Sequence, residues 1–335
     1  MAANSYGSPE RPSSKMAIRR VVRITNRAIS LGIGSCGCMR AVRPAEGISL
    51  PSPATPSRST GISGRAVAML AALAVALVAA FVVAPRTLAA SSSSSGSVDE
   101  RNLREALRAA FVEYWSSGDR DFSPGLARVV DYWFRYHVAK AVIAAILLIV
   151  LVALGVLLWK AFLGAGGLGV RRRAALASAV LVTMLALFSL VMVMANVQGA
   201  VAPFASLFPM LTVGATDGEL ADTLDQVRQR LADSLSAGGQ TPPALEVMIS
   251  DFSRYHVAMA VVAAIVAVVL IGMSVVLWKR FARTESSDRR TRRVLGSFGV
   301  LAALLSLAVI VVVVANTTTA ADPAPALLAF FDGGW

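Results

Sequence analysis

The side chains best suited to chemistry in this sequence occur in two matching sets. The tripeptide Arg-Tyr-His stands at 135–137 and again at 254–256, each time directly before an apolar segment. Both histidines of the chain belong to these tripeptides, and Asn196 and Asn316 follow a later apolar segment of each half. An imidazole beside an arginine can sense pH or bind an anion. The candidate site is therefore an outer polar cluster of Arg135, His137, Lys140, Asn196, Arg254, His256 and Asn316.

The same residues also have a simpler interpretation, which is anchoring at the membrane surface. Arginine and tyrosine are common at the headgroup level of a bilayer, and placing histidine or asparagine there costs little free energy. Lys140 is the only charged residue within the apolar segments, and its counterpart in the second half is Met259. We expect its ammonium group to reach towards the membrane surface. A buried pair with Asp131 or Asn196 is the alternative.

The remaining motifs give no indication of an enzyme. The sequence has neither an H-E-x-x-H nor a G-x-S-x-G motif, and no cluster of histidine and cysteine with metal-ligand spacing. Cys36 and Cys38 have no histidine nearby to complete a metal site. The segment 164–169 matches G-x-G-x-x-G, but it joins two apolar segments and is interpreted as a turn. We predict no catalytic residues, no metal and no cofactor; an enzyme would have to rely on Asp131, Asp251 and the histidines.

Composition and apolar patterning predict the elements that position the cluster. Hydrophobic residues make up 56% of the chain, and the mean hydropathy is +0.65, too high for an ordinary soluble domain. Since a hydrocarbon core of about 30 Å needs roughly 20 helical residues, each apolar segment is long enough to span it. The predicted transmembrane helices are 66–84, 138–159, 174–195, 257–278 and 294–315.

The chain has a net charge of +12, and the distribution of its basic residues indicates its membrane topology. Residues 1–65 carry ten basic and two acidic side chains, and the turns 160–173 and 279–293 are also basic, whereas the other connections are balanced or acidic. The positive-inside rule places these three basic regions in the cytoplasm and the C-terminus outside. We therefore predict a multi-pass protein of the cell membrane that contacts the lipid bilayer and no nucleic acid.

The matching sets belong to a longer internal repeat. We divide the chain into a disordered basic segment at 1–65, a helix at 66–84, and membrane repeats at 97–215 and 216–335. The helix at 66–84 is either a retained anchor or a signal peptide, because the small residues at 87–90 offer a cleavage site.

Each repeat is predicted to begin with an outer amphipathic helix. Capping-box patterns stand at 97–100 and 216–219, followed by apolar residues at helical spacing. The predicted fold is an all-α membrane protein with two tandem two-helix transmembrane hairpins, which form a four-helix bundle of parallel repeats. Trp115 and Tyr114 of the first outer helix are the expected contact surface for a partner.

Residues 97–335 resemble a group of uncharacterised actinobacterial membrane proteins that are labelled by a twin-arginine signal. The resemblance lies in the Arg-Tyr-His entries, the Trp-Lys exits at 159–160 and 278–279, the basic turns and the Ala-Asn ends. It implies an exported or membrane-embedded protein and no particular activity. Arg19-Arg20 departs from the signal, because Val21 and Val22 follow it where a bulkier residue is usual.

The expected function is that of a non-enzymatic structural or interaction protein, which binds copies of itself or another membrane protein. The alternative is a small transporter or channel component that uses the outer polar cluster. Few polar residues are available within the predicted spans to line a pathway, which favours the structural interpretation.

Overall fold

The computed structural model describes residues 64–90, 102–164, 169–214, 217–237 and 241–334. The chain divides into units Met1–Ser59 and Thr60–Trp335, and every described residue belongs to the second. The described residues form helices and no strand. The elements are α2 (Gly64–Ala90), α3 (Leu103–Ser117), α4 (Pro124–Gly164), α5 (Val170–Val201), η1 (Ala205–Leu207), α6 (Phe208–Thr212), α7 (Gly218–Ala237), α8 (Pro243–Arg283), α9 (Arg289–Ala321) and α10 (Pro323–Phe331).

Five helices of the described chain, α2, α4, α5, α8 and α9, are long and apolar enough to cross a membrane. The prediction of five apolar helices of membrane length is confirmed. Their sides expose large apolar residues such as Ile149, Val268 and Val311, which are each more than 60% exposed. Such surfaces suit contact with lipid, as in a polytopic membrane protein.

The helices α4 and α8 are longer than the predicted spans that they contain. Each has 41 residues, whereas about 20 suffice to cross the hydrocarbon core. Both begin at a proline, which is tolerated in the first helical turn because its missing N–H has no partner there. The Arg-Tyr-His tripeptides therefore lie inside continuous helices and not at helix starts.

The long helices pack in a chain of neighbours, α2 on α4, α4 on α5, α5 on α8 and α8 on α9. Side-chain hydroxyl groups join two of these pairs. Ser189 Oγ of α5 donates to the Ala144 carbonyl oxygen of α4 at 2.9 Å, and Ser274 Oγ of α8 donates to Gly299 O of α9 at 3.2 Å. Hydrogen bonds of this kind support helix association in lipid, where apolar burial alone gives little.

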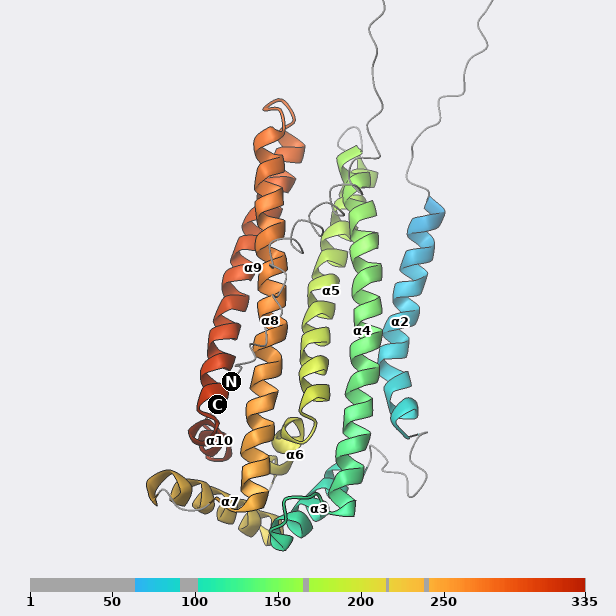
Figure 1. Cartoon of the computed structure of the whole chain (residues 1–335). Coiled ribbons are helices and arrows are strands. Elements are labelled where there is room, and N and C mark those ends of the chain that lie inside the picture. Colours follow the sequence, from blue (N-terminus) through green and yellow to red (C-terminus); the bar gives the residue numbers. More distant parts are fainter. Residues whose placement is uncertain (1–63, 91–101, 165–168, 215–216, 238–240, 335) are drawn as a thin grey trace, which may run out of the picture. The chain divides into compact units, whose positions relative to one another are not determined.

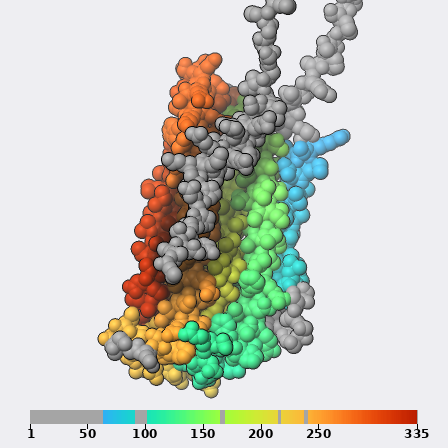
Figure 2. Space-filling view, in the orientation of Figure 1, coloured from blue at the N-terminus to red at the C-terminus, as the bar shows by residue number. Residues whose placement is uncertain are grey.

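The short helices gather at one end of the long ones (Figure 1, Figure 2). They share one buried apolar cluster with the adjoining ends of α4 and α8. The short helices contribute large side chains to it, among them Phe111 of α3, Phe208 of α6, Val227 of α7 and Phe331 of α10. Tyr136 and Tyr255, the middle residues of the two tripeptides, pack against this cluster. The cluster therefore holds the tripeptide ends of α4 and α8 in place.

This shared cluster changes the role expected for the outer amphipathic helices. Tyr114, predicted to lie on a partner-binding surface, is fully buried in the cluster. Trp115 is half-buried, and its Nε1 donates to Gln226 Oε1 of α7 at 3.2 Å. The apolar sides of α3 and α7 are therefore used within the chain, because they cover one another and the ends of α4 and α8.

Several predicted features fall on residues outside the described ranges. These are the capping box at 97–100, Thr216 of the second capping box, Cys36 and Cys38, Arg19-Arg20, and most of the Gly-rich segment 164–169. The N-cap of α3 is Asn102, which makes no side-chain capping hydrogen bond.

Candidate functional site

His137 of α4 and Asn196 of α5 form a hydrogen bond between the two helices. The distance from His137 Nδ1 to Asn196 Oδ1 is 3.0 Å. Asn196 Nδ2 donates to the carbonyl oxygen of Met192, one turn earlier in α5, at 2.7 Å. Because the amide nitrogen is used in this way, the amide oxygen faces the imidazole, and His137 Nδ1 carries the proton.

The second half of the chain has the same arrangement between α8 and α9. His256 Nδ1 lies 2.9 Å from Asn316 Oδ1, and Asn316 Nδ2 donates to Val312 O at 2.9 Å. We call these two contacts the His–Asn clamps. Each joins a pair of adjacent long helices near the end that carries α3 and α7.

Aromatic rings pack against each imidazole. The ring of His137 meets Trp133 edge-on at a centroid distance of 4.8 Å, and His256 meets Phe252 in the same manner at 4.6 Å. His137 Nε2 is buried and has no hydrogen-bond partner among the described residues. Rings held in this way have little freedom to rotate towards a ligand.

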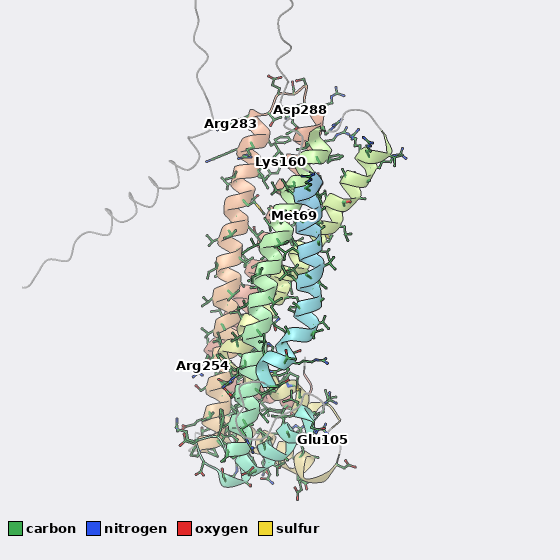
Figure 3. All side chains as sticks on the ribbon, turned by 90° about the vertical axis from the view of Figure 1, so that its right-hand side faces the viewer. Met69, Glu105, Lys160, Arg254, Arg283 and Asp288 are labelled. Carbon is green, nitrogen blue, oxygen red and sulfur yellow. The ribbon has the colours of Figure 1, made fainter. Side chains whose placement is uncertain are left out.

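The two arginines of the predicted cluster are turned towards carboxylates on their own helices. Arg135 pairs with Asp131 at 2.9 Å, and Arg254 pairs with Asp251 at 3.2 Å. Figure 3 shows Arg254 towards the same end of the helices as Glu105 of α3. Neither arginine joins a His–Asn clamp, so the predicted cluster is divided into separate local pairs.

The two carboxylates differ in their surroundings. The side chain of Asp131 is 51% exposed, whereas that of Asp251 is 10% exposed. Asp251 Oδ2 also accepts a hydrogen bond from the backbone N–H of Ala205 at 2.8 Å. Asp251 thus fixes the start of η1 against α8, which is a structural task.

Lys140 forms neither of the pairs considered from the sequence. Its Nζ lies over two aromatic rings, 4.7 Å from the centroid of Tyr136 and 4.9 Å from that of Phe81 in α2. Within the described ranges, no hydrogen bond or ion pair joins it to Asp131 or Asn196. Cation–π contacts of this kind stabilise an ammonium group but leave its N–H donors available.

A further contact that sequence reasoning missed also links the two halves. Gln198 Nε2 of α5 donates to the backbone carbonyl oxygen of Tyr255 in α8 at 3.2 Å. Gln198 is 6% exposed. A single glutamine near the end of an apolar segment gives no pattern from which this partner could be predicted.

The described residues contain no group of three or more His, Cys, Asp or Glu side chains placed to hold a metal ion. Comparisons of the chain with protein-family models, curated proteins and solved structures found no match. The assignment of function therefore depends on the residues of this chain alone.

Proposed function

We propose that this protein is a non-enzymatic structural or interaction protein of the cell membrane. Its core would be two tandem hairpins, α4–α5 and α8–α9, with α2 as an N-terminal anchor. The five apolar helices support a place in the bilayer, and the repeated tripeptides support the tandem arrangement. The resemblance to actinobacterial membrane proteins agrees with this location and adds no activity.

The observation that carries this proposal is the pairing within the His–Asn clamps. Each imidazole is bonded to an asparagine of the adjacent helix and is packed against aromatic rings. A transport site needs polar groups that face a shared pathway and can exchange partners. Groups that are already bonded between helices fit the role of fastening the hairpins together.

The charge distribution supports the proposed orientation, with the N-terminus in the cytoplasm and the C-terminus outside. Figure 3 shows Lys160, Arg283 and Asp288 at one end of the long helices and Arg254 at the other. The first end carries the basic turns, which the positive-inside rule assigns to the cytoplasm. The short helices would then lie on the outer side.

Flux measurements in proteoliposomes test the proposal against the transporter alternative. Wild type and the double variant His137→Ala, His256→Ala would be compared for proton and anion flux with empty liposomes. We expect neither protein to exceed the empty liposomes. Flux in wild type that the double variant abolishes would overturn the structural assignment.

A second measurement tests the expected self-association. Fluorescently labelled full-length chain would be reconstituted at low density, and the photobleaching steps in each spot would be counted. We expect most spots to hold more than one copy. Spots with single copies, together with no membrane-protein partner in photo-crosslinking, would contradict an interaction role.

A further inference from the structure

A cleft lies between α2, α4 and α5, within the membrane-length part of these helices. Its volume is about 320 Å³, and its walls include Val78 and Phe81 of α2, Ala144 of α4, and Phe188 of α5. Ser189 also lines the cleft, but its hydroxyl group already donates to Ala144 O. The cleft therefore offers an apolar ligand a dry, apolar surface.

A positive charge stands at one end of this cleft. Lys140 precedes Ala144 by one helical turn, so the two residues share a face of α4. The Nζ of Lys140 lies 4.9 Å from the ring of Phe81, which lines the cleft. No carboxylate pairs with Lys140 within the described chain, so its charge is available to an anion.

The charge beside this cleft has no equivalent at the matching position of the second repeat. The counterpart of Lys140 is Met259, and the main contact of α2 is with α4. A lysine that served only to reach the membrane surface would need no contact with α2. Through Phe81, Lys140 lies beside the cleft that α2 helps to form.

We propose that this cleft binds one anionic phospholipid, with an acyl chain between α2, α4 and α5 and the phosphate at Lys140. An acyl chain matches the apolar walls, and an ammonium group attracts a phosphate strongly where water is scarce. This lipid would fasten α2 to the hairpin α4–α5. The site rests on the proposed place in the membrane and requires that α2 is retained in the mature protein.

Native mass spectrometry of the purified full chain tests the site. Phosphatidylglycerol and phosphatidylcholine with identical acyl chains would be added separately, and the fraction of protein that retains one lipid would be measured. We expect wild type to prefer phosphatidylglycerol by roughly fivefold, the effect of one lysine near an anionic headgroup. Lys140→Met should abolish this preference, while Lys160→Met, the same charge change at the opposite end, should preserve it.

Substitutions that fill the cleft test the acyl-chain contact separately from the lysine charge. Val78→Trp should reduce retention of both lipids, whereas Val82→Trp, an exposed position of α2 outside the cleft lining, should not. Glycerol phosphate without acyl chains should fail to compete. The lipid site would be overturned by equal retention of both lipids by wild type, by an unchanged preference in Lys140→Met, or by a protein mass that lacks α2. None of these results bears on the flux that tests the proposed function.

Discussion

Gly199 of α5 lies directly against the imidazole ring of His137 in α4. A Cβ atom built on Gly199 would come within 2.7 Å of His137 Cε1. The close approach of α5 therefore depends on the missing side chain, and it sets the ring position that allows the bond to Asn196.

Replacement of Gly199 by alanine should displace the His137 ring and weaken the contact between α4 and α5. Overpacking of this kind costs about 1–3 kcal/mol of unfolding free energy. Gly272→Ala is the matched control, because no heavy atom lies within 4 Å of the Cβ built there. The unfolding free energies of both variants are measured in detergent, with tryptophan fluorescence as the signal. Equal stability of the two variants would contradict the close approach.

The His–Asn clamps should each contribute to the stability of their helix pair. In a double-mutant cycle of His137→Ala and Asn196→Ala, we expect a coupling free energy of about 0.5–1.7 kcal/mol. The cycle of His256→Ala and Asn316→Ala should give a similar value, because the bond lengths match. A coupling near zero in both cycles would show that the bonds do not fasten the helices.

Asp251 and Asp131 should differ in their effect on stability despite their similar place before the tripeptides. Asp251→Ala leaves the buried N–H of Ala205 without its acceptor, which costs about 1–3 kcal/mol. Asp131→Ala removes an exposed ion pair and should cost less than about 0.5 kcal/mol. Chemical denaturation measures the unfolding free energy of the two variants. Equal losses of unfolding free energy would contradict the greater structural role of Asp251.

Tyr114 should make the protein sensitive to alkaline pH. Burial raises the pKa of its phenol from the ordinary value of 10.0 to about 12. The neutral phenol therefore contributes its full stability below pH 10.0, and that contribution is lost as the pH rises through about 12. Tyr114→Phe should remove this part of the alkaline decline, which denaturation at a series of pH values measures. Parallel decline of wild type and variant across this interval would show that Tyr114 is not responsible.

The two cysteines allow a direct test of the proposed orientation. Cys36 and Cys38 are the only cysteines of the chain and precede α2. A membrane-impermeant maleimide should label them only after the cells are permeabilised, whereas Asp233→Cys on α7, in a chain with both native cysteines replaced by serine, should be labelled in intact cells. The reverse labelling pattern would show that the N-terminus lies outside and α7 in the cytoplasm, which would contradict the proposed orientation.

The membrane-length helices could be predicted from the order of the amino acids alone. An apolar stretch of about 20 residues has one stable form in lipid, since its backbone groups must bond within the segment. The five helices follow from that requirement alone. The spacing of the repeated tripeptides likewise pointed to His137 and His256 as matching positions.

The partner of each polar residue, by contrast, depends on how the helices pack against one another. Asp251 is buried because η1 returns against α8, and Lys140 meets Phe81 because α2 packs on α4. Tyr114 is buried because α3, α7 and α10 share a core with the ends of the long helices. These contacts join residues far apart in the chain, and periodicity within a segment carries no information about which distant surface will cover it.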